Sequence, residues 1–111
     1  MHIATRVAGT STVVDVQGDI DLYNSPEVRK IVLEELKEKK VARLIVNLTG
    51  VRYIDSSGVA SLVEGLKVAR TLNSRFMLFG LSPAAREVLE LSRLIRVFEV
   101  FTTEEEAVKA P

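Results

Sequence analysis

Cysteine is absent from this chain of 111 residues, and histidine occurs once, at position 2. Without cysteine the chain cannot form a disulfide bond, a thiolate metal site or an iron–sulfur cluster, and it has no cysteine nucleophile. One histidine near the N-terminus cannot provide a serine–histidine–aspartate triad or a histidine metal cluster. We therefore expect no catalytic residue, no metal and no cofactor.

An excess of charge is also lacking, because 15 Lys and Arg residues balance 15 Asp and Glu residues. The basic excess that attracts phosphate backbones is missing, so we do not expect nucleic acid as a partner. No segment approaches the roughly 18 consecutive apolar residues of a membrane span, and Met1–Arg6 lacks the basic and apolar regions of a secretion signal. These absences predict a cytoplasmic protein without a membrane span.

The composition that remains is that of an ordinary folded domain, with 47% hydrophobic residues, 27% charged residues, six Gly and three Pro. A chain of this length is close to the usual size of one domain. No linker or internal repeat divides it. We therefore predict a single domain over residues 1–111.

Four segments have the length and residue types of β-strands, residues 3–8, 12–17, 44–48 and 76–79, and residues 97–98 suggest a last short strand. The small-residue turn Gly9–Ser11 joins the first two and predicts an N-terminal β-hairpin. The third and fourth are continuous apolar runs, which is typical of strands buried on both faces. The third is expected at the centre of the sheet, and Phe76, Met77 and Phe79 in the fourth are expected in the core.

Four segments show helical spacing of apolar residues after a helix-start signal: Ser25 to about Lys39, about Ser57 to Asn73, Ser82 to Leu89, and Thr103 onward. Ser25 and Ser82 each precede a proline, which predicts a serine N-cap with proline in the first helical position. Thr103 and Glu106 predict a capping box. In the first helix, charged side chains are expected on the solvated face: Glu34, Glu35, Lys37, Glu38 and Lys39.

Strands that alternate with helices over short connections imply right-handed crossovers between parallel strands. The predicted fold is α/β, with a mixed, mostly parallel sheet of four to five strands, about four helices and the N-terminal hairpin. The strands' carboxyl ends meet at one edge, where α/β proteins place ligands. The loops at 18–24, 50–58 and 81–82 should lie there.

The segment Tyr53–Val59 joins the predicted central strand to an amphipathic helix. In one interpretation it is only a helix start, in which Asp55 or a serine caps the first turn and Gly58 permits close packing. In another, a serine at this helix N-terminus can be phosphorylated, because backbone N–H groups and the helix dipole favour a phosphate there. If the helix begins at Ser57, that hydroxyl caps the turn and Ser56 faces outward.

The same edge is expected to hold Asp19, Asp21 and Asp55, with no Lys or Arg. Taken singly, these are ordinary solvated loop acids. Taken with a phosphate, they would make the edge strongly negative and could repel a docked partner. Val59 is expected mostly in the core, although an exposed apolar residue in the first helical turns could anchor a partner.

Three segments together resemble the successive signatures of STAS domains, specifically the stand-alone anti-sigma-factor antagonists of bacteria: Gly18–Pro26, Leu44–Leu48 and Tyr53–Gly58. Their order and spacing match over nearly the whole chain. The chain departs from many relatives in having Val59-Ala60 where those relatives have Leu-Gly.

The resemblance implies that Ser56, with Ser57 as the second choice, is phosphorylated by a partner that is both anti-sigma factor and serine kinase. The unphosphorylated form would bind this partner and free a sigma factor, and a serine phosphatase would reset the switch. A monomer or weak dimer is expected. The residues expected at the partner interface are Asp19, Asp21, Asp55, Ser56, Ser57, Gly58, Val59 and Ser82.

Two other classes of function remain alternatives. An enzyme would need Ser56 or Ser57 as nucleophile with Asp55 as helper, but the chain has no histidine base in reach, no Gly-x-Ser-x-Gly elbow and no Gly-rich Lys-Ser/Thr phosphate loop. We therefore expect a protein without enzymatic activity. The other alternative is a non-switching STAS subunit of a stressosome or a lipid-transport system, which would use the fold as an assembly surface.

Overall fold

The computed structural model describes all 111 residues, Met1–Pro111. One five-stranded sheet has the strand order β1-β2-β3-β4-β5, in which only β1 and β2 are antiparallel. The strands are β1 (His2–Ala8), β2 (Ser11–Gln17), β3 (Arg43–Gly50), β4 (Arg75–Phe79) and β5 (Glu99–Phe101). The mixed sheet, the hairpin and the central position of β3 are confirmed.

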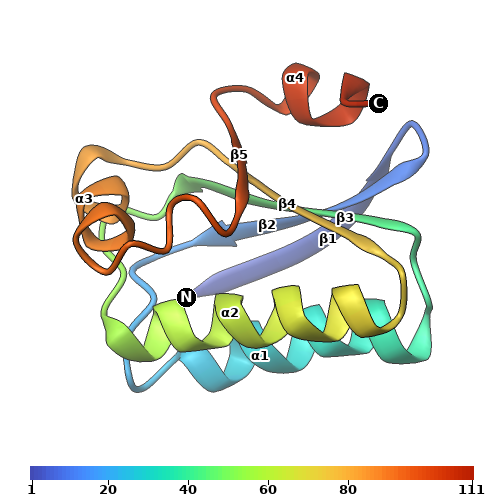
Figure 1. Cartoon of the computed structure of the whole chain (residues 1–111). Helices are drawn as coiled ribbons and strands as arrows, with labels where there is room; N and C mark the ends of the chain where they lie inside the picture. The colour runs from blue at the N-terminus through green and yellow to red at the C-terminus, as the bar shows by residue number, and fades with distance from the viewer.

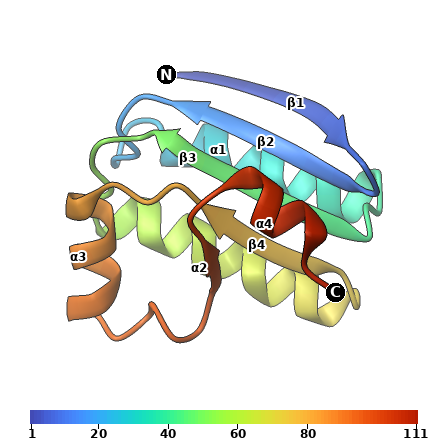
Figure 2. The same ribbon diagram turned by 90° about the horizontal axis from the view of Figure 1, so that it is seen from above.

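The helices are α1 (Ser25–Leu33), α2 (Ser56–Thr71), α3 (Pro83–Leu91) and α4 (Glu104–Lys109), and α1 continues into a π-helix, η1 (Glu34–Glu38). Helices α1 and α2 lie side by side on one face of the sheet, while α4 lies on the other face (Figure 1). Helix α3 lies beyond one end of the sheet, the end at which β4 finishes (Figure 2). The four predicted helices are confirmed, and none of them is long and apolar enough to span a membrane.

Two clusters of buried apolar side chains lie on opposite faces of the sheet. The larger one, with 20 buried residues, lies between the sheet and helices α1, α2 and α3. The smaller one consists of Val13, Ile45, Met77, Phe79 and Ala107, and α4 covers it. Strand β4 supplies both clusters, because Phe76 and Met77 point to opposite faces. The core positions predicted for this strand are confirmed.

Three of the helix starts can be compared with their predicted caps. Ser82 caps α3 by accepting a hydrogen bond from the Ala85 N–H at 3.1 Å, and Thr103 forms the predicted capping box with Glu106. The prediction for Ser25 is wrong: Ser25 is the first helical residue, buried and without a capping bond, and Asn24 occupies the N-cap position. Ser25 is displaced because Asp21 and Asn24 organise the preceding turn with their own side chains.

Two further predictions need correction. Glu35 is buried rather than solvated, because the wider π-helical turn, with a bond from the Lys39 N–H to the Glu34 carbonyl, changes which side chains face the sheet. The Lys39 ammonium neutralises it at 2.6 Å. Val97 and Phe98 precede β5 instead of forming it, because Phe98 enters the core beside Phe76, with ring centroids 6.4 Å apart.

Candidate functional site

The loops that follow β2, β3 and β4 meet at one end of the sheet, as predicted. Ile20 and Ile54 form a parallel bridge, in which the Ile20 N–H donates to the Tyr53 carbonyl and the Asp55 N–H donates to the Ile20 carbonyl, each at 3.0 Å. The Ser82 hydroxyl donates to the Arg52 carbonyl at 2.7 Å and ties in the third loop. The fold therefore brings residues far apart in the sequence to the start of α2.

Asp55 is the N-cap of α2. Its Oδ1 accepts a hydrogen bond from the Gly58 N–H, and its Oδ2 accepts one from the Leu22 N–H, each at 3.0 Å. The capping interpretation is confirmed for Asp55. The alternative, in which the helix begins at Ser57 and that hydroxyl caps the turn, does not hold, because the helix begins at Ser56, one residue earlier.

Ser56 is exposed at the first position of α2, and its hydroxyl has no hydrogen-bond partner in the protein. Ser57 follows it, half-buried. Ser56 also lies at one end of a shallow groove along α2, whose apolar lining residues are Val59, Ala60, Val63 and Leu94. The Ser56 oxygen is therefore open to a second protein, while the backbone around it is fixed by Asp55.

Gly58 lies where α2 passes closest to the bridged loops. A Cβ atom at this position would be 2.6 Å from the Ile54 Cγ2 atom and 2.8 Å from both the Cγ2 and the carbonyl oxygen of Ile20. No side chain fits between these groups without displacement. Gly58 thus sets how closely the first turn of α2 approaches both loops.

Asp19 and Asp21 act first as acceptors for backbone groups. Asp19 accepts from the Tyr53 N–H at 3.1 Å, and Asp21 accepts from the N–H groups of Tyr23 at 2.9 Å and Asn24 at 3.1 Å. The expectation that this end of the sheet holds no Lys or Arg is wrong. The Arg52 guanidinium, which is largely exposed, lies 3.5 Å from the Asp19 carboxylate.

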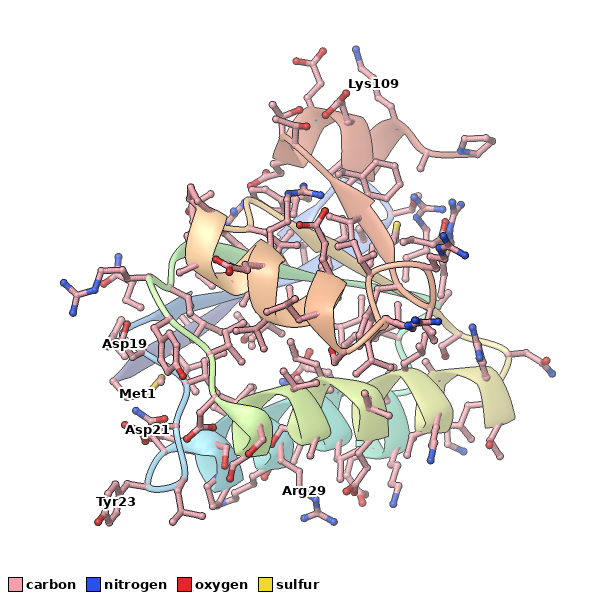
Figure 3. All side chains as sticks on the ribbon, turned by 60° about the vertical axis from the view of Figure 1, so that its left-hand side comes forward. Met1, Asp19, Asp21, Tyr23, Arg29 and Lys109 are labelled. Atoms are coloured by element: carbon pink, nitrogen blue, oxygen red, sulfur yellow. The ribbon has the colours of Figure 1, made fainter.

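Two exposed apolar side chains beside the site were not predicted. Leu22 is 66% exposed and Tyr23 is 90% exposed, and both lie in the loop whose backbone Asp55 holds. Figure 3 shows Tyr23 projecting away from the body of the protein, on the same side as Asp19 and Asp21. One sequence signal could have indicated these two side chains. Both are large and largely apolar, and they stand in a polar loop that was predicted to lie at the same end of the sheet as the Asp-Ser-Ser-Gly motif. Val59, by contrast, is 7% exposed, so little of its side chain is open to a partner.

Solved structures with the same fold cover nearly the whole chain. A crystal structure of a putative anti-sigma factor antagonist from Thermotoga maritima matches with a TM-score of 0.90 and 21% identity, over 96% of this chain and 92% of that one. The anti-sigma factor antagonist SpoIIAA in its unphosphorylated form matches with a TM-score of 0.81 and 23% identity, over 96% and 93%. At these identities the likeness shows the fold.

Sequence comparison identifies the family. An anti-sigma-B factor antagonist from Listeria monocytogenes serovar 1/2a is 35% identical over 91 residues, which is 82% of this chain and 79% of the relative. A protein of the same description from Staphylococcus aureus strain NCTC 8325 is 28% identical over 94 residues, which is 85% of this chain and 86% of the relative. The model of the STAS domain matches residues 2–107. The chain therefore belongs to the STAS domain family.

Proposed function

We propose that this protein is a cytoplasmic anti-sigma-factor antagonist, controlled by phosphorylation of Ser56. Its unphosphorylated form binds an anti-sigma factor that is also a serine kinase, and this binding releases a sigma factor. Phosphorylation ends the binding, and a serine phosphatase restores it. The names of the relatives from Listeria and Staphylococcus support the role as antagonist.

The observation that carries the proposal is the state of the Ser56 hydroxyl. It is exposed and forms no hydrogen bond with another group of the protein, because Asp55 already caps the helix. A kinase could therefore modify it without breaking a contact that holds the fold. A phosphate at the first helical position would also lie near free N–H groups and the positive end of the helix dipole. Ser57, half-buried at the next position, is the less accessible hydroxyl.

The proposed partner surface surrounds Ser56. Of the residues predicted there, Gly58 and Val59 are buried, so the proposed surface consists of Asp19, Asp21, Asp55, Ser56, Ser57 and Ser82, joined by the exposed Leu22 and Tyr23. Most of the polar members in this set hold backbone groups in place, so we assign to them the shape of the surface. Large exposed side chains such as Tyr23 are the type that anchors a partner.

The switch itself follows from charge. A phosphate adds about −1.5 to −2 charges. At about 8 Å from an acidic group of the partner, a charge of −2 costs about 1 kcal/mol in water and about 4 kcal/mol at an effective dielectric constant of 20. Since about 1.4 kcal/mol changes an affinity tenfold, one phosphate weakens binding by about one to three decades. No change of fold is required, and no catalytic step by this chain is involved.

The test begins with a pull-down from a lysate of the source cells, with and without ATP, followed by mass spectrometry of phosphopeptides. We expect an ATP-binding kinase in the eluate and phosphate on Ser56. The purified partner is then titrated with the wild type and with Ser56→Ala, Ser56→Asp and Thr10→Asp. Ser56→Asp should bind at least about tenfold more weakly. Ser56→Ala should keep most of the affinity, and so should the control Thr10→Asp, which adds the same charge at an exposed residue in the distant turn between β1 and β2. Equal binding by folded Ser56→Ala and Ser56→Asp would show that the proposal is wrong.

A further inference from the structure

Strand β1 forms one edge of the sheet, and no other segment of the chain lies beyond it (Figure 2). It pairs with β2 along its whole length, from His2 opposite Gln17 to Ala8 opposite Ser11. In an antiparallel pair, alternate residues bond to the neighbouring strand while the N–H and C=O groups of the others point away. Counting back from the two-residue turn at Gly9 and Thr10, the residues whose N–H and C=O groups point away from β2 are Ile3, Thr5 and Val7.

Edge strands are normally protected against pairing with another chain by proline, lysine, a bulge or an outward charge. β1 contains no proline and no lysine, and its register with β2 has no irregularity. Arg6 is its only Lys or Arg, and the Arg6 guanidinium binds groups on β2 and α4 instead of lying along the open edge. The Arg6 Nε lies 2.7 Å from the Asp15 carboxylate on β2, and its Nη1 lies 3.0 Å from the Glu104 carboxylate on α4. These two carboxylates also neutralise its charge.

The side chains of these three residues also lie on one face of the sheet. Ile3 packs against the larger core cluster, so Thr5 and Val7, two and four residues further on, belong to the same side. Both are exposed, and Val7 is 77% exposed. The strand therefore presents an open row of backbone groups and, next to it, the largely exposed apolar side chain of Val7. The other edge, β5, has only three residues, Glu99–Phe101.

We propose that β1 pairs antiparallel with β1 of a second copy of this chain, about a twofold axis at Thr5, so that two five-stranded sheets become one of ten strands. A seven-residue strand pairs with its own copy over its full length only when its central residue lies on the axis. This register places Ile3 opposite Val7 of the partner subunit, and the reverse, which gives two apolar cross-strand pairs. It places the neutralised Arg6 opposite Ala4 of the partner subunit, so no like charges are directly opposed.

Ser56 itself stays accessible in this dimer. Ser56 begins α2, which lies below the β4 side of the sheet, away from the β1 edge (Figure 2). Because the two copies are antiparallel, their Ser56 residues lie at opposite ends of the shared sheet. Self-association and the phosphorylation proposed above are therefore independent, and each can fail without the other.

The chain's lack of cysteine allows a direct test by disulfide formation. In the proposed dimer two Thr5 Cα atoms lie about 5.5 Å apart, within the range that a disulfide spans. Two Val7 Cα atoms lie about 14 Å apart, which is too far. Under mild oxidation, Thr5→Cys should form a covalent dimer and Val7→Cys should not. A mixture of Ile3→Cys and Val7→Cys chains should form the mixed dimer.

The mass in solution gives a second readout. Sedimentation equilibrium from about 10 μM to about 1 mM should show a shift toward twice the mass of one chain. Val7→Lys should raise the dissociation constant at least about tenfold. Leu91→Lys, which replaces an equally exposed side chain on α3, should leave it unchanged. The mass of a single chain at every concentration, equal cross-linking of Thr5→Cys and Val7→Cys, or an unchanged dimer in Val7→Lys would each overturn the proposal.

Discussion

Gly58 contributes both to the packing of the fold and to the shape of the candidate site, because the first turn of α2 touches both bridged loops at this residue. In Gly58→Ala the new methyl group would overlap Ile54 and the backbone of Ile20. Overpacking of this kind costs about 1–3 kcal/mol, which corresponds to a melting temperature lower by about 4–13 °C. Thermal unfolding followed by circular dichroism measures the loss.

Ser57→Ala is the matched control for this prediction. It alters the neighbouring residue in the same helical turn, where the hydroxyl has no protein partner, and its melting temperature should stay within about 2 °C of the wild type. If Gly58→Ala were as stable as Ser57→Ala, the close approach of α2 to the loops would not contribute to stability.

The two Ser-Pro pairs show why helix starts are only partly predictable from sequence. Ser82 is an N-cap as expected, whereas Ser25 lies inside its helix. The difference comes from Asp21 and Asn24, whose side chains bond to each other's backbone N–H groups and take over the turn before α1. A dipeptide signal does not contain this competition. Asp55 was among the capping candidates, but only the bond from the Leu22 N–H shows that it also holds the neighbouring loop.

Helix α4 covers only the small apolar cluster on its face of the sheet, and charged contacts also hold it there. Arg6 connects it to β1 and β2 through Glu104 and Asp15. The same guanidinium lowers the pKa of both carboxyl groups below their usual values. A carboxyl group with a lowered pKa in the folded state stabilises the protein above its ordinary pKa, and this contribution is lost as the pH falls through the lowered value.

Arg6→Met should therefore reduce the free energy of unfolding by about 1 kcal/mol at pH 7, since the groups are partly exposed to solvent. The difference from the wild type should shrink as the pH falls below the ordinary carboxyl range near about pH 4, and should continue to shrink toward the acid end of the series. Urea unfolding at a series of pH values measures it. Arg86→Met, which removes an exposed arginine without an ion pair, should show no such pH dependence. A deficit in Arg6→Met that is equal at pH 7 and pH 2 would contradict the role of the ion pairs.

The elements themselves were predicted more accurately than their boundaries. Periodicity located the helix up to about Lys39, but it assumed a uniform α-helix, and the π-helical turn brings Glu35 inside. Near β5, apolar residues alone could not separate a strand from a loop that sends one aromatic ring into the core. Phe98 is such a ring, and the strand begins at the next residue, Glu99.

At the scale of the whole molecule, the equal numbers of basic and acidic residues govern the solubility. With a formal net charge of zero and an isoelectric point near 6.6, the unmodified protein should be least soluble close to pH 6.6. Ser56→Asp adds one negative charge and should move this minimum to lower pH, while Ser56→Ala should not. Precipitation by polyethylene glycol over a pH series measures the minimum. The same minimum for all three proteins would contradict the charge argument.

The order of strands and helices followed from hydrophobic pattern, because alternating short apolar runs and amphipathic segments leave few topologies for a chain of this length. The side of the sheet that collects the candidate site followed from the same rule. The exposure of Tyr23, the pairing of Arg52 with Asp19 and the unoccupied edge of β1 depend on how loops and strands meet in space, and the pattern does not encode them.

The hairpin turn at Gly9 and Thr10 lies at the far end of the sheet from the start of α2 (Figure 1). Thr10 is exposed there. A single thiol introduced in place of Thr10 could tether the molecule to a biosensor chip in one defined orientation, with the end that contains Ser56 facing the flowing analyte.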